Sequence, residues 1–123
     1  MAIEVTGRHI DISDTMKRYA ENKALELDRN FPRLENIHVV MDVEKFRHLV
    51  EVLVQGAHLR VEAKETTDDM YASLDAAFEK AERQIRRLRR KIQDQHRNRP
   101  PLPDVEEVIQ NGLKNEDETG PNV

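Results

Sequence analysis

The residues with the most distinctive chemistry are the arginines and lysines of residues 83–99, RQIRRLRRKIQDQHRNR. This segment carries eight basic residues and one acidic residue, Asp94, although the whole chain has a net charge of −4. Arginine presents a planar fork of N–H donors that fits the oxygens of a phosphate group. A concentrated basic block in an acidic chain therefore predicts a surface that binds a polyanion, and nucleic acid is the leading choice.

The basic block falls in the longest predicted helix. Apolar residues recur there at intervals of three and four, which predicts a helix from about residue 68 to 96. These residues are Met70, Leu74, Ala77, Phe78, Ala81, Ile85, Leu88 and Ile92. Thr66 or Thr67 can cap the start, and Asp68 and Asp69 place negative charge at the positive end of the helix dipole.

A helical wheel with Ile85, Leu88 and Ile92 toward the core separates the basic side chains from the apolar side. It places on the opposite side Arg83, Arg86, Arg87 and Arg90, flanked by Arg89 and Lys91. Few acidic residues lie four positions away to relieve their mutual repulsion. Three interpretations remain open for this face: contact with nucleic-acid phosphates, a solvated surface, or contact with an acidic partner such as the acidic end of the same chain.

Other residues that could perform catalysis or bind a metal have simpler explanations. Three histidines fall on three different predicted strands: His38, His48 and His58. They lack the close spacing of a zinc site, and the helix start explains Asp68 and Asp69. Tyr71 could either stack on RNA or pack on the sheet. The chain has no cysteine and no phosphate-binding glycine loop, so we expect no enzyme, no metal, no cofactor and no small-molecule substrate.

The elements that must position the basic helix follow from hydrophobic periodicity. Residues 2–6 alternate as a strand that ends at Gly7. Residues 11–31 have the spacing of a helix that Ser13 or Asp14 can cap and that a proline ends. Three further runs alternate like strands: residues 36–45, 48–55 and 58–65. Their short connections predict an antiparallel meander.

The predicted order is therefore strand, helix, three strands, helix. A right-handed crossover would pair the first two strands in parallel, and both helices would cover one face of a four-stranded sheet. This predicts a two-layer α+β domain over residues 1–98. Residues 99–123 are acidic and begin near three prolines, so we expect a tail without fixed structure. A partner's groove could instead order four of its apolar residues as an amphipathic turn: Val105, Val108, Ile109 and Leu113.

The chain also shows neither an apolar run long enough to span a membrane nor an N-terminal leader of the secretory type. We therefore expect no membrane partner and a cytoplasmic location.

Several segments together resemble the family of short ribosome hibernation factors, which includes the hibernation promoting factor and the ribosome-associated inhibitor A. The densest match is DMYASLD, residues 69–75, and it continues through Lys80, Arg83 and Gln84. VTGRHIDIS near the N-terminus and VEKFRH after the second strand also match. The similarity covers residues 1 to about 96.

The resemblance implies a double-stranded-RNA-binding-like fold that binds the small ribosomal subunit and its rRNA, overlaps the tRNA and mRNA sites, and represses translation under stress or in stationary phase. It implies rRNA contacts at six positions: Lys17, Lys23, Lys80, Arg83, Arg87 and Lys91. Arg86 and Arg90 are additional charges in the same stripe, whereas Glu26 stands where relatives often have lysine. We expect a monomer off the ribosome. The alternative function is a protein-interaction module whose basic helix binds an acidic partner.

Overall fold

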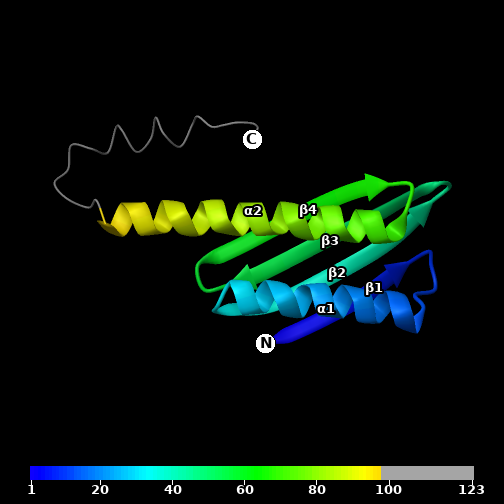
Figure 1. Cartoon of the computed structure of the whole chain (residues 1–123), viewed down its shortest axis with the longest axis horizontal. Helices are drawn as coiled ribbons and strands as arrows, with labels where there is room; N and C mark the ends of the chain where they lie inside the picture. The colour runs from blue at the N-terminus through cyan, green and yellow to red at the C-terminus, as the bar shows by residue number, and fades with distance from the viewer. Residues whose placement is uncertain (98–123) are drawn as a thin grey trace. The chain divides into compact units, whose positions relative to one another are not determined.

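The computed structural model describes residues 1–97 of the chain, with side chains through Lys91. Its elements follow one another as β1 (Ala2–Arg8), α1 (Asp14–Asn30), β2 (Leu34–Glu44), β3 (Arg47–Gly56), β4 (Leu59–Thr67) and α2 (Met70–Arg97) (Figure 1). This is the predicted order. The expected domain boundary after residue 98 and the expected acidic tail, with its apolar residues, lie outside the described residues.

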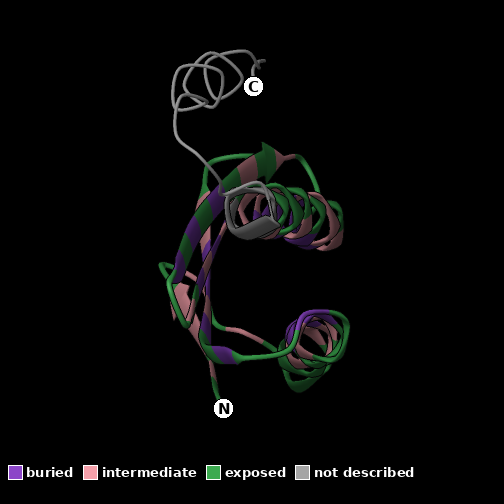
Figure 2. Ribbon diagram, turned by 90° about the vertical axis from the view of Figure 1, so that its left-hand side faces the viewer, coloured by how far each residue is buried: buried purple, intermediate pink, exposed green. Residues whose placement is uncertain are grey.

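The four strands form one sheet in the order β1-β2-β3-β4. β1 pairs in parallel with β2, with Ile3 opposite Ile37, and the other two pairings are antiparallel. A parallel pair of consecutive strands needs a crossover connection, and α1 supplies it. Figure 2 shows both helices on the same face of the sheet. The prediction of a two-layer α+β domain is confirmed.

The core lies between the sheet and the two helices. Alternate residues of β3 and β4 are buried, as the period of two requires. In β2 the buried residues include the consecutive Val39, Val40 and Met41, and in β1 Ile3 and Val5 are half-buried. The largest side chains with almost no exposure include Ile37, Met41, Val52, Leu74 and Ile85. Because Leu74 and Ile85 come from α2, this core fixes the orientation of the helix that carries the basic residues.

Side-chain caps begin both helices. Ser13 accepts a hydrogen bond from the Met16 backbone N–H at 3.1 Å, as predicted for α1. At the start of α2, the Asp69 carboxylate accepts from the Ala72 backbone N–H at 2.9 Å. The helix therefore starts two residues later than predicted, and Asp69 makes the capping hydrogen bond that was expected from Thr66 or Thr67. Thr67 instead accepts from the Asp69 N–H at 3.0 Å and so supports the cap.

Gly7 does not end the first strand, in contrast to the prediction. β1 continues through it to Arg8. A Cβ atom at residue 7 would lie 2.8 Å from both the Ile10 carbonyl oxygen and the Ile12 Cγ1 atom. Glycine is required there because the segment that leads into α1 passes directly over the strand.

Two tight turns build the predicted meander. Glu44 pairs with Arg47 across the first turn, which leaves Lys45 and Phe46 as the connecting residues. Gly56 pairs with Leu59 across the second, so His58 lies in a turn and not on a strand as predicted. Lys45 and His58 both have φ near +60°. Positive φ values in a tight turn suit the right-handed twist of the paired strands better than the negative φ values of a type I turn.

Candidate nucleic-acid interface

Arg83 and Arg87 lie on the exposed side of α2. They follow the buried Ala81 and flank the buried Ile85, whose packing fixes this side of the helix toward solvent. Among residues 1–91, no acidic side chain lies within 4.0 Å of either guanidinium group. The donors of both arginines are thus available to an anion that approaches from solvent.

Arg90 and Lys91 continue α2 beyond this pair, and both side chains are exposed. Arg83 and Arg87 are together called the α2 basic row below. On α1, the side chain of Lys17 is also exposed. The structure thus leaves exposed six of the eight predicted contact residues: Lys17, Arg83, Arg86, Arg87, Arg90 and Lys91.

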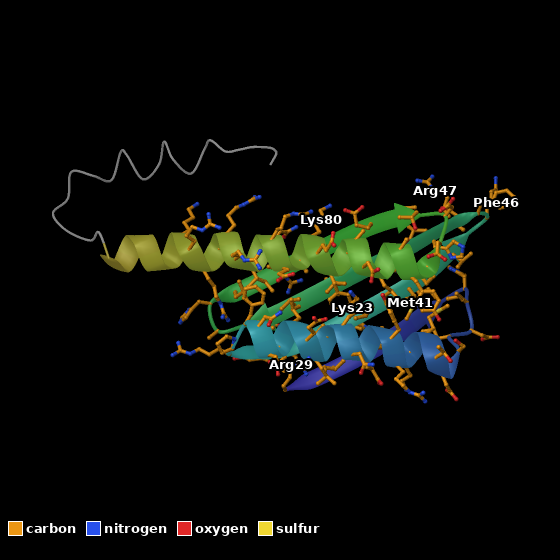
Figure 3. The ribbon with its side chains drawn as sticks, viewed as in Figure 1. Lys23, Arg29, Met41, Phe46, Arg47 and Lys80 are labelled. Carbon is orange, nitrogen blue, oxygen red and sulfur yellow. The ribbon has the colours of Figure 1, made fainter. Side chains whose placement is uncertain are left out.

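Lys80 lies one turn before the row and makes contacts within the protein. Its ammonium group donates to the Lys64 carbonyl oxygen at 3.3 Å and lies 3.8 Å from the Glu65 carboxylate. Both partners belong to β4, and Figure 3 shows Lys80 on the side of α2 away from α1. Its side chain is still 40% exposed, so this is a surface ion pair that costs little to break.

Arg86 is exposed, as the helical wheel predicted, and it also makes contacts within the protein. Its Nη2 atom donates to the Glu82 carboxylate at 2.8 Å, and its guanidinium carbon lies 5.6 Å from the centre of the Phe31 ring. Phe31 is the residue at which α1 ends. Arg86 therefore occupies the flank of α2 that faces α1, and it is separate from the α2 basic row.

Arg89 shares that flank. Its guanidinium donates a hydrogen bond to the Pro32 carbonyl oxygen, immediately after the end of α1. Arg89 therefore satisfies a backbone acceptor in the connection between α1 and β2. Arg86 and Arg89 thus join the two helices.

Lys23 is the second predicted contact residue that the structure uses internally. Its ammonium group lies 3.0 Å from the Asp75 carboxylate of α2 and 5.7 Å from the centre of the Tyr19 ring. The Tyr19 hydroxyl donates to the same carboxylate at 2.6 Å. Figure 3 shows Lys23 on the side of α1 that is nearer to α2. Tyr19, Lys23 and Asp75 thus form a cluster between the two helices, called the inter-helix cluster below.

Tyr71 completes the inter-helix cluster. Its ring meets that of Tyr19 edge to face, with centroids 5.0 Å apart and planes at 86°, a favoured aromatic geometry. Tyr71 is half-buried. It packs against the other helix, so neither of the two roles considered from the sequence, stacking on RNA or packing on the sheet, describes this contact.

The cluster shifts the ionisation of its members. Burial disfavours the charged form of Asp75, but the hydrogen bonds from Tyr19 and Lys23 outweigh it and hold the pKa of this carboxyl below its ordinary value. Burial likewise opposes the charge of Lys23, yet its bond to Asp75 raises the pKa of the ammonium group. The bond to Asp75 also raises the pKa of Tyr19. Near neutral pH, the cluster therefore holds one carboxylate, one ammonium and one neutral phenol.

The histidines do not converge. His38 shares a 2.9 Å hydrogen bond with the Thr6 hydroxyl, and His9 lies 3.0 Å from the Asp42 carboxylate. The Nδ1 atom of His48 is buried without a partner among the described side chains. Within residues 1–91, no three His, Asp or Glu side chains gather as metal ligands would.

None of the helices described is long and apolar enough to cross a membrane.

Residues 3–93 match the family described as "Sigma 54 modulation protein / S30EA ribosomal protein". The chain belongs to this family. Among its S30EA relatives, the ribosome hibernation promoting factor of Azotobacter vinelandii is 32% identical over 107 residues, which cover 84% of this chain and all of the relative. That of Pseudomonas putida is 30% identical over 93 residues, which cover 76% of this chain and 91% of the relative. The predicted resemblance is confirmed.

Solved structures of similar proteins have the same fold. A ribosomal subunit interface protein from Coxiella burnetii aligns with a TM-score of 0.65 and 29% identity, over 72% of this chain and 98% of the other. The N-terminal domain of Protein Y from Thermus thermophilus aligns with a TM-score of 0.66 and 30% identity, over 72% and 99%. The aligned part of this chain thus matches nearly the whole of each of these two structures.

Sequence reasoning missed the inter-helix contacts. From the sequence, Tyr19 was placed only within the helix predicted for residues 11–31, and Asp75 only within the matching segment DMYASLD. The signal that could have found them is the pairing of one carboxylate on the second helix with a Tyr and a Lys four residues apart on the first, because such residues share a helix face. Phe46 was also missed as an exposed aromatic.

Proposed function

We propose that this S30EA protein is a cytoplasmic ribosome hibernation factor that binds the small ribosomal subunit through rRNA phosphates. On this proposal it overlaps the tRNA and mRNA sites and represses translation under stress or in stationary phase. The observation that carries the proposal is the α2 basic row, which stays exposed in a chain whose relatives are named ribosome hibernation promoting factors. Arg83 and Arg87 present guanidinium groups that no described acidic residue neutralises.

The proposed mechanism is steric: the bound protein occupies the site, and no covalent bond is made or broken. Each cationic side chain that reaches a phosphate displaces a condensed counterion, and this release drives binding at low salt. Structured RNA is recognised mainly by its shape and by backbone contacts, because side chains cannot read its deep major groove. A helix that presents Arg83 and Arg87 on one exposed side suits this kind of contact, and the bulk of the bound protein would then exclude tRNA and mRNA.

The eight predicted contacts divide into three roles on this proposal. The α2 basic row, Arg90, Lys91 and Lys17 would contact phosphates directly, since their side chains are exposed. Lys80 and Arg86 would do so after leaving Glu65 and Glu82, which exposed ion pairs permit. Lys23 is held by Asp75 of α2 and would contribute chiefly by linking the two helices.

Co-sedimentation with purified small subunits tests the proposal. Wild-type protein should pellet with the subunits at low salt and be released as salt rises. The double variant Arg83→Glu/Arg87→Glu should lose most of this binding. Arg33→Glu/Arg60→Glu is the matched control, because both residues are exposed, neither belongs to α2, and the change in net charge is the same. Its pelleting should stay near that of the wild type.

The result also decides between RNA and an acidic partner protein. An rRNA-dependent factor must bind a protein-free small-subunit rRNA transcript with the same dependence on Arg83 and Arg87. Equal pelleting of the two double variants would refute the proposal, and so would binding to subunits without any binding to the transcript.

A further inference from the structure

The turn between β2 and β3 exposes an aromatic side chain. Phe46 is 85% exposed, well above the other exposed large apolar residues, Met1 at 54% and Leu25 at 46%. Figure 3 shows Phe46 at the end of the hairpin, directed away from the sheet and both helices. A single exposed apolar residue is ordinary on a protein surface. The exposure of Phe46 therefore indicates a function only together with the residues around it.

The setting is a rigid turn. Strand pairing continues through Glu44 and Arg47, so only Lys45 and Phe46 lie outside the ladder. Lys45 has φ of 60°, a region that glycine or asparagine adopts far more readily than lysine. The turn therefore keeps a long cationic side chain where its backbone would favour glycine, and the paired strands hold Phe46 in one place.

The neighbours of the ring are cationic. Lys45 and Arg47 precede and follow Phe46, and both side chains are exposed. Glu44 faces Arg47 in the strand register, yet no acidic group among the described side chains lies within 4.0 Å of Lys45 or Arg47. An aromatic face between two cations is the combination by which proteins hold single-stranded nucleic acid: the ring stacks on a base and the cations meet the adjacent phosphates.

We propose that the Lys45–Arg47 turn is a second RNA contact, in which Phe46 stacks on an unpaired base and Lys45 and Arg47 bind the flanking phosphates. The inference rests on the proposed function for its RNA partner. An apolar protein groove suits the site less well, because lysine is depleted at the centre of protein interfaces. The turn adjoins the end of the sheet where α2 begins (Figure 1), whereas Arg83 lies thirteen residues further along α2, roughly 20 Å at the rise of a helix. The site is thus separate from the α2 basic row.

Tryptophan fluorescence tests base stacking directly. The chain contains no tryptophan, so Phe46→Trp in the full chain introduces a single reporter at the tip of the turn. Addition of a twelve-nucleotide single-stranded RNA should quench its fluorescence to saturation, whereas a blunt RNA duplex of the same length, which has no unpaired base, should quench it far less. Equal quenching by both RNAs, or none by either, would overturn the proposal.

The partner on the ribosome is identified by photo-cross-linking. With benzoyl-phenylalanine placed at position 46, the cross-link to small subunits should lie on RNA, and a cross-link only to ribosomal protein would refute the proposal. Phe46→Ala should bind subunits roughly 5- to 100-fold more weakly, the size of one lost base–aromatic stack, while Phe46→Tyr should restore binding. Because Phe46 packs against so little, neither variant should affect folding.

The two proposals fail separately. If Arg83→Glu/Arg87→Glu abolishes pelleting while Phe46→Ala binds like the wild type, the stacking site is wrong and the α2 basic row stands. If the wild type itself does not pellet with small subunits, the proposed function is wrong, and the comparison of single-stranded and duplex RNA still decides whether the turn binds an unpaired base.

Discussion

Asp75 of α2 makes two of the contacts that link the helices. It accepts from Tyr19 at 2.6 Å and lies 3.0 Å from the Lys23 ammonium group. Lys23 was predicted as an RNA contact, and its position next to Asp75 gives it a different first role. One carboxylate on α2 thus contacts two side chains of α1.

Asp75→Asn should remove a contribution of about 1 kcal/mol to the free energy of unfolding near neutral pH, which is small because the carboxylate is 45% exposed. The pKa of Asp75 is lowered in the folded state, so its contribution is present above the ordinary aspartate pKa of about 3.9 and is lost as pH falls further. The pKa values of Tyr19 and Lys23 are raised, so their contribution is lost as pH rises above about 10.

Urea denaturation of wild type and Asp75→Asn across pH 3–11 measures this dependence. The difference between the two proteins should be largest on a plateau between these limits and should shrink at both ends. A difference that grew as pH fell below 4 would contradict the proposed ionisation of the cluster.

Among the elements, β1 shows how one small residue positions a helix. Gly7 lets the Ile10–Ile12 segment cross the strand at a distance that a Cβ atom would not allow. Gly7→Ala should lower the free energy of unfolding by about 2 kcal/mol, in the range of an overpacked site, because the nearest obstacle is a backbone carbonyl that cannot rotate away. Thermal denaturation followed by circular dichroism measures the loss. The control is Glu4→Ala, an exposed change on the same strand, which should stay within about 0.5 kcal/mol of the wild type.

At the scale of the elements, the sequence predicted the core side of α2 and the sheet. The apolar period of α2 gave its core side correctly, because Leu74, Ala77, Ala81 and Ile85 are all buried. Strand alternation and the short connections likewise gave the sheet. The wheel correctly predicted that Arg86 is exposed. It could not predict the contact of Arg86 with Phe31, because three apolar residues define the side toward the sheet but not which flank meets another helix.

The contacts that sequence reasoning missed share a physical cause. Tyr19 and Asp75 are 56 residues apart, and Lys23 and Asp75 are 52 residues apart. Their contacts depend on how the two helices pack on the sheet and not on any local spacing. The exposure of Phe46 depends on a two-residue loop, and the sequence predicted only that the connection was short. Local pattern therefore found the elements, whereas the pairing of side chains between elements required the structure.

At the scale of the whole molecule, charge separation is the main feature. Residues 83–99 carry a net charge of +7 in a chain whose total is −4. The acidic remainder should weaken non-specific attraction to RNA elsewhere on the surface, so binding should depend on a few cations. This makes the salt dependence of binding a measure of how many phosphates the row meets.

The dissociation constant for small subunits should therefore rise steeply with salt, with a slope of about 0.7 to 0.9 logarithmic units for each phosphate contact. Arg83→Glu/Arg87→Glu should lower that slope by the amount of roughly two contacts. Fluorescence anisotropy of labelled protein over a salt series gives both slopes. The matched control Arg33→Glu/Arg60→Glu should keep the wild-type slope, and a common slope for all three proteins would show that the row meets no phosphates.

The most direct test of the central claim is a cryo-electron microscopy reconstruction of the chain bound to the small ribosomal subunit. The account predicts that α2 lies against rRNA where tRNA and mRNA bind, with the guanidinium groups of Arg83 and Arg87 within hydrogen-bonding distance of phosphate oxygens. A bound chain whose α2 basic row faced solvent or a ribosomal protein would contradict it.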